Sequence, residues 1–333
     1  MSAATSRHLG LDLGGTNLKW VVVERADAEW RTLGRGRVAT PVADGPDAVV
    51  ACLARQGLAA MADWPGVSTV GIGIPGLYDP AAGTTRFLVN IPGAWSGKPV
   101  ADPVAAALGV PAALINDARA FGLAELRLGA ARGASSMVGL TLGTGVGGVI
   151  AVDGRVVLGH DGTAGEIGHQ TIERDGPACG CGNRGCLEAF ARADRIAEAC
   201  GTATAEEAIG RARAGDAHAI EGLARIGHYL GIGIANLVTL ISPDRVVIGG
   251  GISAAGDLLL GPIRDELRQR VRTTALDRVE IATAELGTWA GAIGAAIHGA
   301  EAVASEPVTS EAVTSEAADS ADAATRRAAV GAP

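Results

Sequence analysis

Four residues with metal-binding side chains lie close together in the sequence. They are His169, Cys179, Cys181 and Cys186, and the three cysteines fall within eight positions. Three thiolates and one imidazole form the ligand set of a closed, structural Zn²⁺ site, and the glycines between the cysteines allow a tight loop. A catalytic zinc would keep one position open, so we expect this metal to stabilise structure. The alternative is a group of small buried cysteines without metal, which is the interpretation we adopt for Cys52 and Cys200.

Two glycine-rich turns predict phosphate binding. The first contains Gly14, Gly15, Thr16 and Asn17, and the second contains Gly143, Thr144, Gly145 and Gly147. A tight glycine turn directs successive backbone N–H groups to one point, and Asp12 before the first turn could orient a water bound to Mg²⁺. No Gly-Lys-Ser/Thr follows, and a strand follows the second turn where a dinucleotide-binding unit needs a helix. Either turn alone could be an ordinary hairpin, but two of them favour nucleotide binding.

A third glycine run, at 249–251, follows an apolar segment and precedes a helical one. Gly250 and Gly251 would allow a base or ribose to approach the backbone closely. A plain strand-to-helix turn is the alternative.

Asn116 and Asp117 predict an acid–base site. They follow the apolar run 112–115 and precede a helical pattern, so the Asp117 carboxylate could accept the proton of an alcohol that attacks a phosphoryl group. The alternative is that Asp117 is the N-cap of that helix.

Two glutamates flank the predicted metal loop. Glu166 stands three positions before His169, and Glu188 stands two positions after Cys186. The loop could direct both carboxylates toward the hydroxyls of a sugar, and His169 could donate its second ring N–H to the same ligand. Each glutamate alone could instead be a solvated surface charge.

The elements that must position these residues repeat in two halves. The first half predicts strands over 8–13, 18–24, 33–39, 69–74 and 112–115, with helices over 46–62 and 118–129. The second half predicts strands over 137–142, 149–152, 245–248 and 279–282, with helices over 217–241, 258–273 and 289–303. Glycine-rich turns open both halves. We therefore expect a duplicated α/β fold with a ligand cleft between the halves.

The composition bounds the partners and the cellular location. The chain has 333 residues, 49 glycines and a formal net charge of −8. The acidic balance argues against nucleic acid and anionic membranes as partners. Neither a transmembrane segment nor a signal peptide is expected, and the cysteines suit a reducing compartment, so we expect a cytoplasmic protein. Three tandem pentapeptides, beginning at Ser305, Ser310 and Ser315, predict a disordered acidic tail over 304–333.

Several motifs occur together in one order. They are Asp12-Leu13-Gly14-Gly15-Thr16, Gly73-Ile74-Pro75-Gly76, Asn90-Ile91-Pro92-Gly93, Asn116-Asp117-Ala118, Gly143-Thr144-Gly145-Val146-Gly147, Glu166-Ile167-Gly168-His169 and the loop from Cys179 to Glu188. Over about residues 8–300 the chain resembles the ROK family of repressors and sugar kinases, and within it the bacterial ATP-dependent glucokinases. The resemblance implies a two-lobed actin-like ATPase fold, related to ribonuclease H, that is often dimeric or of higher oligomeric state.

The resemblance also implies roles for single residues. Asp117 would be the catalytic base for the sugar 6-hydroxyl. The sugar would be bound by Gly76, Asn90, Asn116, Asp117, Glu166, His169 and Glu188. ATP would be held by Asp12, Gly14, Gly15, Thr16, Asn17, Thr144, Gly145, Gly147, Gly250 and Gly251, with Asp12 assisting Mg²⁺. The small lobe would comprise 1–117 and 288–303, and the large lobe with the zinc loop 118–287.

The predicted activity is transfer of the ATP γ-phosphoryl group to D-glucose. Another hexose (mannose, an amino sugar or an N-acylhexosamine) is the alternative substrate, and polyphosphate is an alternative donor. A sugar-responsive repressor would carry a DNA-binding module before the first glycine turn, and only eleven residues precede Asp12. A sugar-binding regulator without catalytic activity is a further alternative.

Overall fold

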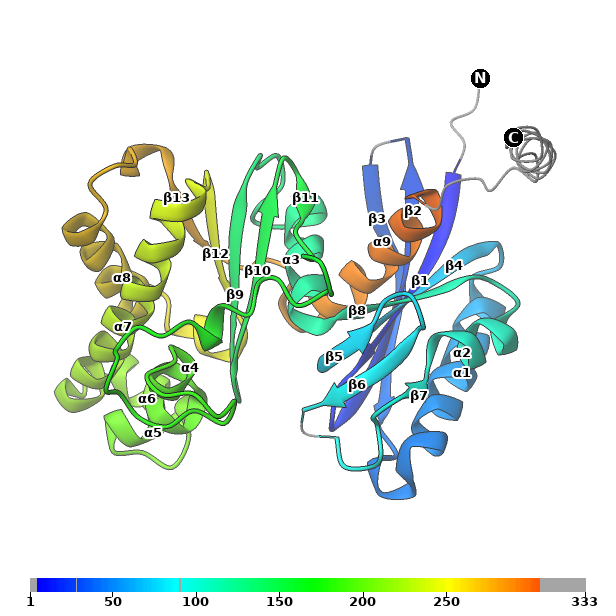
Figure 1. The fold of residues 1–333 in the computed structure, drawn as a ribbon, viewed down its shortest axis with the longest axis horizontal. Coiled ribbons are helices and arrows are strands. Elements are labelled where there is room, and N and C mark those ends of the chain that lie inside the picture. Colours follow the sequence, from blue (N-terminus) through cyan, green and yellow to red (C-terminus); the bar gives the residue numbers. More distant parts are fainter. Residues whose placement is uncertain (1–4, 28, 90, 306–333) are drawn as a thin grey trace, which may run out of the picture.

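Two five-stranded sheets lie side by side with helices α3 and α9 between them (Figure 1). The structure, a computed structural model, describes residues 5–27, 29–89 and 91–305. Asn90 and residues 306–333 of the predicted tail therefore lie outside the described residues. The prediction that the tail begins at residue 304 is wrong, because residues 304 and 305 belong to helix α9 (Ala290–Ser305).

The first sheet has the strand order β3-β2-β1-β4-β8. Its strands are β1 (Thr5–Leu13), β2 (Asn17–Ala26), β3 (Glu29–Ala39), β4 (Val67–Ile74) and β8 (Ala112–Asn116). Leu9, Leu11 and Leu13 are buried in a core formed with helices α1 (Gly45–Asp63) and α2 (Ala101–Leu108). Side chains alternate along a strand, so Asp12 emerges on the opposite face, at the carboxyl end of β1.

The second sheet repeats this design with the order β11-β10-β9-β12-β13. Its strands are β9 (Met137–Leu142), β10 (Val146–Val152), β11 (Arg155–Val156), β12 (Arg245–Gly249) and β13 (Glu280–Thr283). In both sheets the first three strands in sequence are antiparallel and the last two are parallel to the first. The β1–β2 and β9–β10 turns therefore occupy equivalent positions.

Helices cover the second sheet and link it to the first. They are α3 (Asp117–Leu128), α4 (Glu188–Ala191), α5 (Ala193–Cys200), α6 (Ala205–Arg213), α7 (Ala217–Ile241), α8 (Asp257–Arg270) and α9 (Ala290–Ser305). Short 3₁₀ turns occur at Val42–Asp44, Ile167–His169, Gly251–Ala255, Leu276–Arg278 and Gly287–Trp289.

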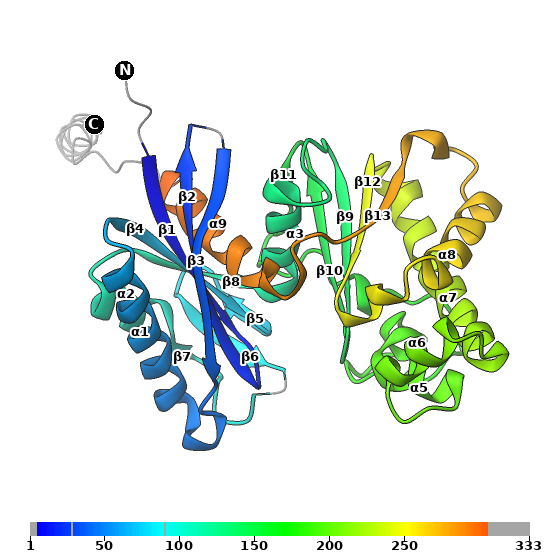
Figure 2. The same ribbon diagram turned by 180° about the vertical axis from the view of Figure 1, so that it is seen from behind.

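Helix α9 returns from the second sheet to the first, and Figure 2 shows the chain crossing between them after β13. Its approach depends on glycines. A Cβ at Gly10 would lie 1.8 Å from the Ala292 carbonyl oxygen, and one at Gly71 would lie 1.6 Å from that of Ala295. On its other side, a Cβ at Gly294 would lie 1.7 Å from the Ala120 carbonyl oxygen in α3. These contacts fix α9 between the first sheet and α3.

Helix α7 is long and apolar enough to cross a membrane by length and composition alone, and it is the one such helix among the described residues. Its buried residues Leu223, Ile226, Leu230, Ile234 and Val238 recur every three or four positions. They belong to the core that α7 shares with α8 and the second sheet. This periodicity is that of a core helix with one buried face.

The predicted strands and helices are confirmed, with small shifts at their ends. One shift changes a predicted site: β10 begins at Val146, so Gly147 pairs with Thr141 inside the sheet and lies beyond the second turn. The small sheet formed by β5 (Gly76–Asp79), β6 (Thr84–Leu88) and β7 (Lys98–Pro99) was not predicted, nor were β11, α2, α4, α5 and α6. Elements this short carry too little hydrophobic periodicity to be recognised.

Candidate active site

Asp117 is the first residue of α3, directly after β8 ends. The helix is capped by its neighbour: the Asn116 side-chain oxygen accepts hydrogen bonds from the backbone N–H groups of Ala118 (3.0 Å) and Arg119 (3.3 Å). The alternative that Asp117 is the N-cap is therefore wrong. One Asp117 oxygen accepts from the Ala118 N–H at 2.8 Å, and the carboxylate is otherwise available for chemistry.

The surroundings of Asp117 raise its pKa from 3.8 to about 7. Burial is the largest cause, followed by the negative charge of Asp12; the Ala118 N–H and the Arg119 guanidinium oppose the shift, and Glu166 adds to it. Burial also raises the pKa of Asp12, although Lys19 lies 3.3 Å away and opposes this. A carboxyl group with a pKa near 7 is suited to act as a general base at neutral pH.

The first glycine turn joins β1 to β2. The Gly14 N–H donates to the Asn17 carbonyl at 3.1 Å, and the Thr40 hydroxyl donates to the Gly14 carbonyl at 2.7 Å. Among the described residues, nothing accepts from the N–H groups of Gly15 and Thr16. These two donors are therefore available to a phosphate group.

The second glycine turn joins β9 to β10 and is also closed by the N–H of its first glycine, over a span one residue shorter. The Gly143 N–H donates to the Gly145 carbonyl at 3.0 Å. The Val146 N–H donates to the Glu188 carboxylate at 2.9 Å, and a Cβ at Gly145 would lie 2.5 Å from that carboxylate. Within the described chain, the N–H groups of Thr144 and Gly145 have no acceptor. Glu188, predicted to contact sugar, thus supports the second turn with one of its oxygens.

The third glycine run packs against the second turn. Gly250 has a φ of +82°, and a Cβ there would lie 2.1 Å from the Leu142 carbonyl oxygen. Gly251 begins the following 3₁₀ turn. Gly250 therefore lies beside the carboxyl end of β9, where the second glycine turn starts, and Gly251 follows it.

The four predicted metal ligands come together. One donor atom from each of His169, Cys179, Cys181 and Cys186 lies within 4.8 Å of all the others. His169 Nδ1 is 3.7 Å from Cys179 Sγ, and Cys181 Sγ is 3.7 Å from Cys186 Sγ. A tetrahedral site with Zn–S bonds of about 2.3 Å has ligand–ligand distances of about 3.8 Å. The donor set and its spacing therefore fit a metal ion such as zinc.

The predicted sugar-binding pair lies beside this cluster. His169 Nε2 is 4.0 Å from Glu166 Oε2. Because His169 directs Nδ1 toward Cys179, a metal bound at Nδ1 would leave Nε2 protonated and facing Glu166. A donor and an acceptor at this spacing can bind hydroxyl groups of one ligand.

Gly76 and Asn116 are joined by their own contact. Asn116 Nδ2 donates to the Gly76 carbonyl at 3.1 Å, which ties the small sheet to the start of α3. Gly76 has a φ of +146°, and a Cβ there would lie 2.2 Å from the Phe87 carbonyl oxygen. Both predicted sugar ligands are therefore beside Asp117, and one N–H of Asn116 remains for a ligand.

Arg119 is a site residue that the sequence analysis missed. Its guanidinium, 2% exposed, is 2.8 Å from Glu166 Oε1 and 2.9 Å from Asn116 Oδ1. A sequence signal was available, because Arg119 stands in the first turn of a largely apolar helical segment. A charged residue buried there must have hydrogen-bonding or ionic partners. The positions of those partners could not be read from the sequence.

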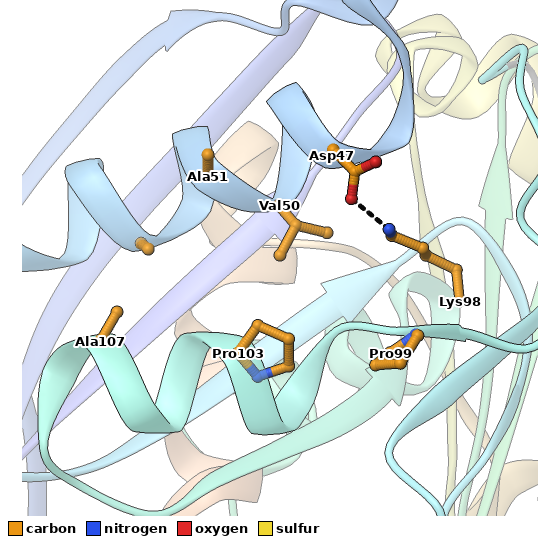
Figure 3. A pocket seen from close by; sticks show the side chains of 8 residues that line it. Asp47, Val50, Ala51, Lys98, Pro99, Pro103 and Ala107 are labelled. Carbon is orange, nitrogen blue, oxygen red and sulfur yellow. Dashed lines mark hydrogen bonds and ion pairs between the residues drawn. The ribbon is translucent and has the colours of Figure 1, made fainter.

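A cavity of about 400 Å³ lies apart from these residues, between α1, α2 and β7 (Figure 3). Its lining is mainly apolar, and its charged side chains are Lys98 and Asp47, which pair with each other. It contains none of the predicted site residues.

Comparisons with known proteins agree with this architecture. The model of the ROK family matches residues 8–301. A glucokinase from Thermotoga maritima is 34% identical over 307 residues, which cover 86% of this chain and 95% of that protein. A ROK hexokinase from Thermus thermophilus has a TM-score of 0.78 at 36% identity and covers 90% of this chain and 100% of that chain. A ROK family glucokinase from Streptomyces griseus, solved with glucose and AMPPNP, has a TM-score of 0.74 at 30% identity, covering 89% and 100%. The predicted two-lobed actin-like fold is confirmed.

Proposed function

The chain belongs to the ROK family, and we propose that it is a sugar kinase that transfers the γ-phosphoryl group of ATP to the 6-hydroxyl of D-glucose. One observation carries the proposal: burial and the charges of Asp12, at the carboxyl end of β1, and Glu166, of the predicted sugar pair, raise the pKa of Asp117 to about 7. Few reactions other than phosphoryl transfer to an alcohol need a base, two phosphate turns and hydroxyl-binding groups at one place.

In the proposed reaction Asp117 accepts the proton of the sugar 6-hydroxyl. The O6 oxygen then forms a bond to the γ-phosphorus, and the bond from that phosphorus to the β–γ bridging oxygen breaks. ADP leaves with the electron pair. Phosphoryl transfer depends mainly on positioning and charge stabilisation, which the N–H groups of Gly15, Thr16, Thr144 and Gly145 would supply.

Two metals complete the proposal. Asp12 lies at the carboxyl end of β1 beside Lys19 and would orient the hydration shell of Mg²⁺ bound to ATP. Bound Mg²⁺ would neutralise phosphate charge. His169 and the three cysteines would hold Zn²⁺, which would fix the loop that carries Glu166 and Glu188.

The identity of the sugar is the part of the proposal that a panel of substrates tests. Purified protein would be assayed by ADP release with glucose, mannose, glucosamine and N-acetylated hexosamines, and with ATP or polyphosphate as donor. We expect the highest kcat/KM with glucose and ATP. Another hexose that turns over more than ten times better would replace glucose, and binding without turnover of any sugar would indicate a regulator.

A further inference from the structure

Arg119 is buried in the first turn of α3, two residues after the proposed base. Its side chain is 2% exposed, and the element that it contacts, the loop at 163–166, lies more than forty positions later in the chain. Burying an arginine removes much of its solvation, so a buried guanidinium is stable only where its N–H groups donate to protein acceptors.

Every nitrogen of this guanidinium has a partner. Nε donates to the Ala164 carbonyl at 3.0 Å, and Nη1 donates to Asn116 Oδ1 at 2.9 Å. Nη2 contacts the carbonyls of Thr163 (3.0 Å) and Ala164 (2.8 Å), and it lies 2.8 Å from Glu166 Oε1. The planar, forked guanidinium therefore holds a fixed geometry that a lysine could not reproduce.

These contacts connect the two halves of the proposed chemistry. Asn116 caps the helix that begins with Asp117, and Glu166 faces His169 through its other oxygen, Oε2. With Oε1 engaged by Arg119, Oε2 is the oxygen left to accept a sugar hydroxyl. The guanidinium thus sets the position of the sugar-binding carboxylate relative to the base.

We propose that Arg119 is a positioning residue that holds the sugar-binding carboxylate of Glu166 at a fixed distance from Asp117 and so determines sugar affinity. The proposal rests on the proposed function for the identity of the reaction. The claim about sugar binding does not rest on the proposed reaction, because Arg119 would position Glu166 for the sugar before any phosphoryl transfer.

The alternative is that Arg119 only holds the 163–166 loop on α3. That role would lower the stability of the protein when Arg119 is replaced, with no preference for sugar over nucleotide. The two roles therefore differ in which substrate is affected.

The test compares Arg119→Met with Arg119→Lys, using Arg127→Met as a control. Arg127 lies two turns further along α3. It pairs with Glu301 and donates to the Gly154 carbonyl, so these partners differ from those of Arg119. We expect Arg119→Met to weaken calorimetrically measured glucose binding and raise the glucose KM by at least tenfold, with the KM for ATP changed less than twofold. Arg127→Met should change neither.

The pH dependence of kcat/KM distinguishes the effect of the Arg119 charge from the effect of its hydrogen-bond geometry. The charged groups facing Asp117 are Asp12 from β1, Arg119 from its own helix and Glu166 from the loop, with Lys19 of β2 paired to Asp12. Loss of the Arg119 charge should move the acidic limb of kcat/KM to higher pH. Arg119→Lys should leave that limb near its wild-type position while the glucose KM stays raised.

A double variant keeps the proposal testable if Arg119→Met is poorly folded. Arg119→Lys combined with Glu166→Gln should bind glucose no more weakly than the weaker single variant, because both changes remove the same contact. Additive losses, or equal losses of glucose and ATP affinity, would overturn the proposal. Wild-type protein that binds glucose without turning it over would contradict the proposed function and leave the Arg119 binding test intact.

Discussion

The two glycine turns share one local design but differ in what supports them. In each, the N–H of the first glycine closes the turn, and two following N–H groups are without a protein acceptor in the described chain. The β1–β2 turn is braced by Thr40, which follows β3 of the same sheet. The β9–β10 turn is braced by Glu188, which belongs to the segment that follows the cysteine cluster.

The difference shows how one copy of a duplicated turn can come to depend on a residue outside its own sheet. The first turn is supported by its own sheet, so its geometry requires little else. The second turn is held by the Glu188 carboxylate, which follows Cys186, a predicted metal ligand, by two residues. Metal occupancy should therefore influence nucleotide binding through the second turn and leave the first turn intact.

Asp117 belongs to neither turn, and replacing it should produce the largest effect. Asp117→Asn removes the base while keeping the size of the side chain, so kcat should fall by about 10²–10⁴-fold. Nucleotide binding should persist because neither turn is altered, and glucose binding should largely persist because the other predicted sugar-binding residues remain. Steady-state kinetics and calorimetry measure both; turnover within twofold of wild type would exclude Asp117 from the mechanism.

Removal of the metal should have the next largest effect. Cys181→Ser, or chelation of the metal, is expected to lower activity on the order of 100-fold, because loss of the loop releases both Glu166 and Glu188. Elemental analysis should find about one zinc per wild-type chain, as one four-ligand site predicts. Full activity in folded, zinc-free protein would contradict the dependence of the second turn on the metal.

The pH dependence should follow the raised pKa of Asp117. The carboxylate is the active form, so kcat/KM should fall about tenfold per pH unit below 7 and level off above it. Stability should change in the opposite sense: the folded state binds this proton more tightly than the unfolded state, so stability from this group falls as pH rises from about 4 to 7. The Asp117→Asn variant should accordingly melt at a higher temperature than the wild type at pH 8. A wild-type kcat/KM that does not fall between pH 7 and pH 5 would contradict the shifted pKa.

A matched pair of substitutions compares the two supports directly and should give the smallest effects. Glu188→Gln weakens a charge-assisted hydrogen bond, so the KM for ATP should rise about fivefold; Thr40→Val removes a neutral one and should raise it about twofold. Steady-state kinetics with varied ATP measure the difference. Equal effects would mean that the two turns are supported alike.

Much of the fold could be predicted from the sequence, because its signals are local. Apolar runs that end at Asp12, Asn116 and Gly143 predict strands whose carboxyl ends carry polar groups. The periodicity of 217–241 predicts α7 at its observed bounds. Short elements such as β5, β6 and α5 carry too few residues for such a signal, and the start of β10 at Val146 depends on pairing with β9.

The candidate site also has features that the sequence predicts and features that it does not. Sequence spacing was sufficient to group His169 with the three cysteines, since a metal loop is formed by neighbours along the chain. It could not show that Asn116, and not Asp117, is the cap, because both residue types cap helices. Glu166 lies more than forty positions from Arg119, and Val146 lies more than forty positions from Glu188, so only folding could reveal these two contacts.

By itself, the sequence determined the family, the duplicated order of elements, the glycine turns and the four residues that cluster as candidate metal ligands, because each rests on short motifs and their order along the chain. The tertiary structure decided how these parts act on one another: the pKa of Asp117, the support of the second turn by Glu188, and the clamp formed by Arg119. The physical reason is that burial and electrostatic interactions depend on distances in space, which the order of residues along the chain does not fix.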